Sequence, residues 1–261
     1  LVSPFVLRRV KEDVVADLPE KIEDTVMAQL TGEQRKLYLA NQDRIAQQVQ
    51  HREASEFKKD KLKVLAELTK LRQICCDPRL HYEDYKAGSA KLDTCMELVH
   101  GALDGGHRIL LFSQFTGMLD IIGKRLAKED IAFLKLTGAS SKESRAKMVA
   151  QFQAGEVPVF LISLKEGGVG LNLTAADVVI HYDPWWNVAA QDQATDRAHR
   201  IGQQHTVTVY KLIAKDTIEE RIMQMQESKR DLVNSVLGGD GISSALFTRE
   251  DVLALLGGDG R

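Results

Sequence analysis

The sequence is poor in cysteine and in long hydrophobic runs. Its 261 residues include three cysteines, of which Cys75 and Cys76 are adjacent, and no two have the C-x-x-C spacing of zinc and redox sites. This argues against a structural zinc and a disulfide framework, and favours a reducing compartment. No run of about 18 apolar residues occurs, and no signal peptide opens the chain. We therefore expect no membrane partner, and a location in the cytoplasm (the bacterial nucleoid) or in the nucleus.

The sequence also has no large excess of either positive or negative charge. The formal net charge is −2, with 35 basic and 37 acidic residues, whereas a typical nucleic-acid-binding domain is strongly basic. Any contact with nucleic acid must therefore be a local stripe on a nearly neutral protein. The seven histidines have no metal-ligand spacing, and the Ser, His and Asp residues suggest no hydrolase triad. We therefore assign no metal site and no triad.

Residues from about 1 to 86 form a polar segment with helical spacing and no strong strand. Apolar side chains at steps of three and four residues predict an amphipathic helix that stops before Asp77-Pro78. A more polar helix is predicted from Gln34 to Val49. The stripe of the amphipathic helix consists of Leu62, Leu65, Leu68, Leu71 and Cys75.

From about residue 88 onward, strand and helix patterns alternate. Short continuous apolar runs are typical of strands buried on both faces, and an alternating run at 207–213 predicts a final, more exposed strand. Strands separated by helices predict an α/β fold, a parallel sheet covered by helices on both faces. The continuous runs lie at 109–112, 159–162 and 178–182, and a further strand is predicted at 133–136.

Helices are predicted between and after these strands. One covers 118–127, and Ser140 with Glu143 forms a capping-box pattern for another that ends near Gly155. Thr217 with Glu220 opens a last long helix. A short helical pattern follows at 249–256. The sequence therefore predicts a lead-in segment and helical insertion at 1–87, a sheet domain at 88–215, and a brace helix with a tail at 216–261.

The loop directly after the 159–162 strand is rich in glycine. Residues 163–172 read SLKEGGVGLN, and three glycines in four positions let a backbone approach a ligand closely and offer N–H groups to phosphate. Asn172 adds an amide suited to a ribose hydroxyl. Loops after parallel strands are where open α/β sheets bind ligands. The alternative is a sharp strand-to-helix turn without a ligand.

Two arginines follow in the segment QATDRAHR at 193–200. On a helix, Gln193, Arg197 and Arg200 would form a polar stripe beside a face of alanines. A guanidinium is always charged and donates in a fork, so two arginines aimed together suit a phosphate chain. The alternative is a solvated helix face with an ion pair such as Asp196–Arg200.

Three further strand ends carry residues suited to nucleic acid. Both tryptophans of the chain lie in DPWWN at 183–187. Near a groove a tryptophan can wedge or stack, and buried packing is the alternative, above all for Trp185. Small polar residues that can contact backbone phosphates, or merely form turns and caps, are Ser113 and Gln114 at one strand end and Thr137 and Gly138 at another.

In this order, the segments resemble the C-terminal RecA-like lobe of the Swi/Snf-type ATPases within helicase superfamily two. The resemblance covers residues from about 5 to about 237. It is most specific from Ile162 to Gln203, where the three long motifs GGVGLN, DPWWN and QATDRAHRIGQ occur at the family's spacing. FVLRRVK from Phe5 resembles the family's lead-in to this lobe, and LRQICCDP at 71–78 resembles the end of its helical insertion.

The resemblance implies a RecA-like lobe of a DNA-translocating ATPase that uses ATP with Mg²⁺. Its partners would be double-stranded DNA, the N-terminal RecA-like lobe of the same protein, and a DNA-bound protein complex. Arg197 and Arg200 would reach the ATP phosphates with Gln193 beside them, and Gly168, Gly170 and Asn172 would lie on the nucleotide side. The residues that would track DNA are Ser113, Gln114, Thr137, Gly138, Ser163, Lys165, Trp186 and Asn187.

Three positions depart from the family's pattern. Glu166 stands where small residues are usual, and its carboxylate close to the DNA-side phosphates weakens the case for Lys165 as a DNA contact. Val188 replaces the usual proline, and Asp77 replaces the residue type expected before Pro78. The last two affect local shape only.

Two motifs that such a motor needs are missing from the sequence. It has neither a G-x-x-x-x-G-K-[ST] loop to hold phosphates nor an acidic DE-x-H-type segment to hold magnesium. The resemblance places both in the first lobe, so we expect a fragment, opening at Leu1 without methionine, that hydrolyses no ATP alone. One alternative function is a catalytically inert scaffold module with a RecA-like fold that binds nucleic acid or protein. Another is a polymerase-recycling or restriction-type motor of the same superfamily.

Overall fold

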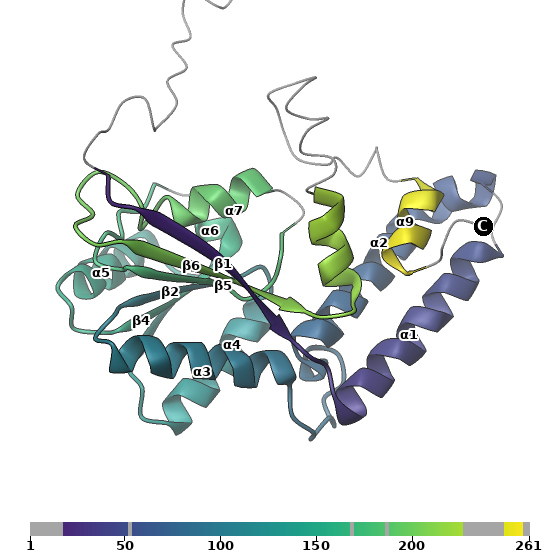
Figure 1. Ribbon diagram of the computed structural model, residues 1–261, viewed down its shortest axis with the longest axis horizontal. Helices are drawn as coiled ribbons and strands as arrows, with labels where there is room; N and C mark the ends of the chain where they lie inside the picture. Colours follow the sequence, from purple (N-terminus) through teal and green to yellow (C-terminus); the bar gives the residue numbers. More distant parts are fainter. Residues whose placement is uncertain (1–17, 52–53, 168–169, 186–187, 227–247, 258–261) are drawn as a thin grey trace, which may run out of the picture.

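A six-stranded parallel sheet forms the centre of the protein (Figure 1). The strand order is β1-β6-β5-β2-β4-β3, and every described pair is parallel. The computed structural model describes residues 18–51, 54–167, 170–185, 188–226 and 248–257. The strands are β1 (Lys21–Ala28), β2 (Ile109–Ser113), β3 (Phe133–Leu136), β4 (Val159–Ser163), β5 (Val178–His181) and β6 (Val207–Ala214).

Helices cover both faces of this sheet, which confirms the predicted α/β fold. Successive side chains of a strand point to opposite faces, so Ile109 and Leu111 of β2 enter one core layer and Leu110 and Phe112 enter the other. The first layer is covered by α3 (Ala90–Asp104) and α4 (Thr116–Lys128), and the second by α5 (Lys142–Gln153), α6 (Leu164–Gly167) and α7 (Val188–Thr195).

The edge strand β1 corrects the expectation that residues 1–86 contain no strong strand. It pairs with β6 along its whole length, from Lys21 with Val207 to Ala28 with Ala214. Lys21, Glu23 and Asp24 are charged and most of the strand is exposed, which is common at sheet edges and hides the alternation of a strand. Val207 and Val209 of β6 are fully buried, whereas Thr208, Tyr210 and Lys211 are half-buried. The last strand is therefore more exposed than β2, β4 and β5, as predicted.

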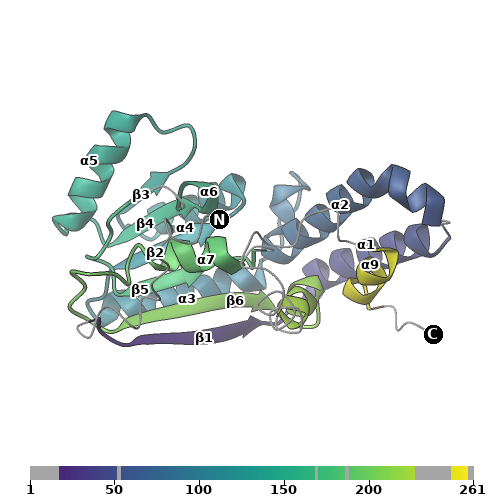
Figure 2. The same cartoon turned by 90° about the horizontal axis from the view of Figure 1, so that it is seen from above.

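A group of helices lies beside the sheet (Figure 2). α1 (Gly32–Gln50) packs with α2 (Ala54–Cys76) and with α9 (Arg249–Leu255), and a short 3-10 helix, η3 (Pro78–Leu80), follows α2. We call α1, α2 and α9 the helical body. α2 ends before Asp77-Pro78, as predicted.

Two details of the predicted helices differ from the structure. Leu62, placed in the buried stripe of α2, is 81% exposed, whereas Leu68 and Leu71 are buried as expected. The residue that caps α5 is Ser141, not Ser140: its extended backbone lets Oγ accept from the N–H of Ser144 at 3.1 Å. The helix predicted after Thr217 is present from 218 and is described as far as 226.

A buried ion pair joins the helix at 218–226, which we call the last helix, to α3. Nζ of Lys91 lies 2.9 and 2.7 Å from the two carboxylate oxygens of Glu219, and neither side chain is exposed. Burial would lower the pKa of Lys91, but the Glu219 carboxylate raises it above its ordinary value. The same ammonium lies 5.2 Å from the ring centre of Tyr182, at the end of β5. The ion pair therefore fixes the last helix against the sheet.

Candidate functional site

Those predicted DNA-tracking residues that the structure describes lie at the carboxyl ends of the strands. Because the sheet is parallel, the loops after β2, β3, β4 and β5 all emerge at one edge, where open α/β sheets bind ligands. Ser113 of β2 is the register partner of Ser163 of β4. The neighbouring pair Leu136 and Ile162 brings Thr137 close to the same place.

Ser113 is buried, with 1% of its surface exposed. Its hydroxyl donates to Oδ1 of Asp183 and accepts from the N–H of Phe115 at 3.1 Å. Oδ2 of Asp183 accepts from the N–H of Gln114 at 3.3 Å. Asp183, in the loop after β5, therefore holds the loop after β2 in place. The hydroxyl of Ser113 is engaged within the protein, and its contact with DNA stays a prediction.

Gln114 is held by Arg72, which was not among the site residues predicted from the sequence. Nη1 of Arg72 donates to Oε1 of Gln114 at 3.2 Å, and Nη2 donates to the carbonyl oxygen of Pro184. Arg72 lies on α2 and is only 2% exposed. Nε2 of Gln114 is buried and has no hydrogen-bond partner among the described residues. The sequence did carry one signal for Arg72, because a charged residue stands next to Leu71 of the predicted apolar stripe.

The other predicted DNA-tracking residues differ in exposure. Lys165 and Gly138 are exposed, Thr137 is half-buried, and Ser163 is buried at the end of β4. The N–H of Thr137 donates to Oγ of Ser140 at 3.3 Å. Trp186, Asn187 and, on the nucleotide side, Gly168 lie outside the described residues.

Trp185 is half-buried and packs against the second core layer. Its carbonyl oxygen accepts from Nε2 of Gln226 on the last helix. The packing interpretation of Trp185 therefore holds in the structure.

The structure places the glycine loop against the arginine segment. The N–H of Leu173 donates to the carbonyl oxygen of Arg197 at 3.0 Å. Nη1 of Arg200 lies 3.5 Å from the carbonyl oxygen of Leu171. Gly170 and Asn172, on either side of Leu171, are exposed, and so is Gln193 of α7. Predicted nucleotide residues from the two motifs thus lie close together.

The two arginines are not on a helix, which corrects the predicted stripe. α7 ends at Thr195, where the backbone bonds reach back three residues instead of four. The N–H of Arg197 donates to the carbonyl oxygen of Ala194, and the N–H of Ala198 donates to that of Thr195. Arg197 is only 9% exposed, which is not a solvated helix face. Burial lowers the pKa of Arg197, the charge of Arg200 lowers it further, and Asp196 raises it. The positive charge of Arg200 therefore acts on the guanidinium of Arg197.

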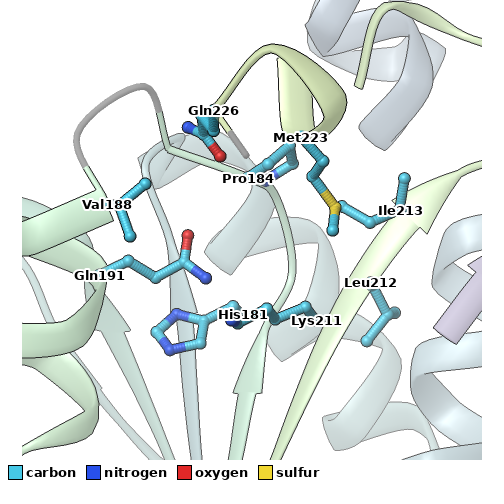
Figure 3. Close-up of a pocket in the computed structure, with 9 residues that line it drawn as sticks. All are labelled: His181, Pro184, Val188, Gln191, Lys211, Leu212, Ile213, Met223 and Gln226. Carbon is cyan, nitrogen blue, oxygen red and sulfur yellow. The ribbon is translucent and has the colours of Figure 1, made fainter. Parts of the chain in front are cut away.

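Two cavities lie away from these residues. One, of about 90 Å³, lies between β5, β6, α7 and the last helix, with the side chains of His181 and Gln191 in its wall (Figure 3). Its volume is well below the roughly 300 Å³ of small ligand pockets. A second, of about 350 Å³, lies at the amino ends of the strands around Arg108 and Gln203. None of the predicted site residues lines either of these two cavities.

His181 is buried in the wall of the smaller cavity. Its Nε2 lies 2.8 Å from Oγ1 of Thr195, and its ring stacks on Phe112 with centroids 5.5 Å apart. Burial, together with the charge of Lys211, lowers the pKa of His181 to about 3, although Glu23 raises it. His181 is therefore neutral and has no charge to offer a phosphate. Within the described residues, no cluster of three metal-ligating side chains occurs and no helix is long and apolar enough to cross a membrane.

Comparison with known proteins identifies the family. The chain matches the helicase conserved C-terminal domain at residues 90–202 and the SNF2-related domain at residues 1–80. A Mycoplasma pneumoniae ATP-dependent helicase is 40% identical over 255 residues, which cover 97% of this chain and 24% of that protein. The chain thus spans about a quarter of the length of the first curated relatives it matches.

Two solved structures from Sulfolobus solfataricus have the same fold. The SWI2/SNF2 ATPase C-terminal domain is 32% identical with a TM-score of 0.74, and the match covers 90% of this chain and 98% of that one. The SWI2/SNF2 ATPase core in complex with double-stranded DNA is 36% identical with a TM-score of 0.75, and covers 97% of this chain and 54% of that one. The sheet is therefore RecA-like, and the chain belongs to the SWI2/SNF2 family, carrying its helicase C-terminal domain.

Proposed function

We propose that this chain is the second lobe of a DNA-dependent ATPase that moves along double-stranded DNA and remodels protein–DNA complexes. The contact between the arginine segment and the glycine loop carries the proposal, because it joins residues of the two predicted nucleotide motifs. Arg197 and Arg200 would face the ATP phosphates beside Gln193, with Gly168, Gly170 and Asn172 around the nucleotide. The remodelled substrate would be a DNA-bound protein complex.

In this proposal ATP binds between two lobes, and each lobe supplies part of the nucleotide site. Binding ATP needs a phosphate-holding loop and ligands for Mg²⁺, and the sequence has neither motif. We propose that the N-terminal RecA-like lobe supplies both, and that this chain supplies the arginines when the lobes close. The family membership and the DNA complex of a 36% identical relative support this assignment.

The DNA side of the proposal rests on the strand ends. Thr137, Gly138, Ser163 and Lys165 lie at the carboxyl ends of the adjacent strands β3 and β4. Ser113 is the last residue of β2, and Gln114 follows it. We place Trp186 and Asn187 on the same track from their position in the sequence after β5. Such a motor would work where DNA is found, in the bacterial cytoplasm or in the nucleus.

Reconstitution from separate lobes tests the proposal. The purified chain alone should show no ATP turnover above background, with or without DNA. Adding a separately purified first lobe that carries the phosphate loop should produce DNA-stimulated turnover. Turnover by the chain alone that is abolished by Arg200→Ala would contradict the split site. DNA binding without turnover in the two-lobe mixture would favour the inert scaffold.

A further inference from the structure

Glu166 and Arg145 form an ion pair in the middle of the predicted DNA track. Glu166 follows β4 on α6, and Arg145 lies in the first turns of α5, after β3. Nη2 of Arg145 is bonded to Oε2 of Glu166, and the two side chains are 19% and 18% exposed. Because β3 and β4 are neighbours in the sheet, the pair spans two adjacent strand ends.

The second carboxylate oxygen of Glu166 faces the loop after β3. A Cβ atom built on Gly138 would lie 3.5 Å from Oε1 of Glu166, so any side chain at position 138 would touch the carboxylate. Lys165, the neighbour of Glu166 in the chain, is exposed. The carboxylate therefore lies among Gly138, Lys165 and Arg145, where the proposed function places phosphates of the DNA.

The ion pair changes what Arg145 can do. A free guanidinium at this edge would bind a phosphate, for which its planar fork is suited. Paired with Glu166, its charge is neutralised, and a phosphate that approached it would also meet the carboxylate. Asp183, another carboxylate at this edge, is buried and accepts hydrogen bonds from Ser113 and Gln114, so it does not neutralise Arg145.

We propose that Glu166 holds Arg145 away from the DNA backbone and thereby limits the affinity of this lobe for duplex DNA. The inference rests on the proposed function, because it concerns the same DNA track. It adds Arg145 as a latent phosphate-binding residue and Glu166 as the residue that sets the strength of DNA binding. A weak contact of this kind lets a moving lobe release one phosphate and take the next.

Salt-dependent binding of a short fluorescein-labelled duplex to the purified chain tests this. Glu166→Gln should steepen the slope of log K against log salt by about 0.9, the value for one added phosphate contact. If that contact gains nothing at about 1 M salt, affinity should rise about 15-fold at about 50 mM and about fourfold at about 200 mM. Arg145→Gln should weaken binding, because it leaves the carboxylate uncompensated.

The double variant shows whether the gain passes through Arg145. Arg145→Gln with Glu166→Gln should return affinity and slope to those of the parent. A double variant as tight as Glu166→Gln alone would overturn the role of Arg145. Melting curves of all three variants show whether they fold, and Glu166→Ala repeats the test without an amide that could bond to Arg145.

A charge-matched control separates this effect from net charge. Glu156 is exposed and precedes β4, so Glu156→Gln makes the same change of charge at the opposite edge of the sheet. β4 is about 16 Å long at roughly 3.3 Å per residue, beyond the screening length of about 10 Å in 0.1 M salt. This variant should bind like the parent. An equal gain from Glu156→Gln would contradict the inference.

Failure of the inference can be distinguished from failure of the proposed function. If the parent binds duplex with ordinary salt dependence while Glu166→Gln stays within about twofold of it, far below the expected gain, the ion pair is only structural. If neither the parent nor Glu166→Gln binds duplex at any salt concentration, the proposed function fails as well.

Discussion

Arg72 and Pro184 are joined by a hydrogen bond although 112 residues separate them in the chain. The donor is Nη2 of a buried arginine on α2, and the acceptor is the carbonyl oxygen that precedes the two tryptophans. The other terminal nitrogen of Arg72 bonds to Gln114. One guanidinium thus connects the helical body to the loops after β2 and β5.

Replacing Arg72 should destabilise the protein. Arg72→Met removes both hydrogen bonds and leaves Oε1 of Gln114 and the Pro184 carbonyl without this donor. Hydrogen bonds to charged groups contribute about 1.5–3 kcal/mol each, so we expect a loss of at least about 2 kcal/mol. Chemical denaturation measures it. Arg35→Met, an exposed site on α1, should stay within about 0.5 kcal/mol of the parent; equal effects would show that the Arg72 contacts contribute nothing special.

The buried pair of Lys91 and Glu219 should show strong coupling. Lys91→Met leaves an unpaired carboxylate in the core, which costs about 3–5 kcal/mol when a buried pair loses one partner. Lys91→Met with Glu219→Gln removes the uncompensated charge and should be clearly more stable than the sum of the single changes. A double-mutant cycle by urea denaturation measures this. Additive single effects would mean that the two groups do not interact.

Stability should fall in acid because of His181. Its pKa is about 3 in the folded protein and near 6.5 when unfolded, so between these values the unfolded state binds more protons. The unfolding free energy therefore decreases as pH falls from about 6.5 towards 3, by about 1.4 kcal/mol per pH unit at most. From pH 6.5 to 5 this group contributes a loss of at most about 2 kcal/mol.

Substitution isolates this contribution. His181→Gln should flatten the decrease of stability over that pH range, measured by denaturation at several pH values. His205→Gln, at an exposed position, serves as the control. A pH profile that is the same in the His181 variant and the parent would show that His181 does not titrate as its burial implies.

The arginines offer the largest expected effect on activity. A guanidinium that stabilises a phosphoryl-transfer transition state raises the rate by about 10³ to 10⁵, which corresponds to roughly 4–7 kcal/mol of barrier. Arg197→Ala and Arg200→Ala should each nearly abolish hydrolysis in a two-lobe protein, with little change in DNA affinity. Lysine should rescue poorly because it lacks the planar fork.

Steady-state ATP turnover decides this prediction. Lys124→Ala, an exposed change on α4, should hydrolyse ATP like the parent. If both arginine variants remain within about threefold of the parent, far short of the expected factor, the two arginines are structural.

Trp186 should matter for movement more than for hydrolysis. In the two-lobe protein, Trp186→Ala should keep much of the DNA-stimulated hydrolysis and impair translocation, because stacking or wedging at the duplex acts during the step. Displacement of a labelled third strand from a triplex measures translocation. Trp185→Ala is the contrasting variant: Trp185 packs on the core, so its loss should lower the melting temperature. Equal loss of both activities in a well-folded Trp186 variant would place that residue in the core.

The sequence predicted the central sheet because its strands are buried on both faces. Ile109 to Phe112 is a continuous apolar run, and the two-sided burial of β2 is its direct cause. β1 escaped prediction because an edge strand is specified by its neighbour and carries charges such as Lys21 and Glu23. Leu62 was misplaced because helical spacing shows which face of a helix is apolar, and cannot show where along the helix a partner covers it.

The site was predictable as a set of motifs, less so as a geometry. Helical spacing placed Arg197 and Arg200 on a helix, yet α7 ends first because the chain turns to bring Arg197 against Leu173. Asp183, Arg72 and Arg145 bond to predicted residues or to their neighbours through tertiary contacts, which no local pattern records.

The pairing of β1 with β6 constrains the order of events while the chain is being synthesised. Lys21 meets Val207, and Ala28 meets Ala214, so the first strand must wait until the residues of β6 have been made. At 5–20 residues per second this delay is roughly 10 to 40 s. The central strands can assemble during that time, whereas the β6 side of the sheet closes last. Lys21, Glu23 and Asp24 keep the waiting strand charged, which protects it against pairing with a neighbouring nascent chain.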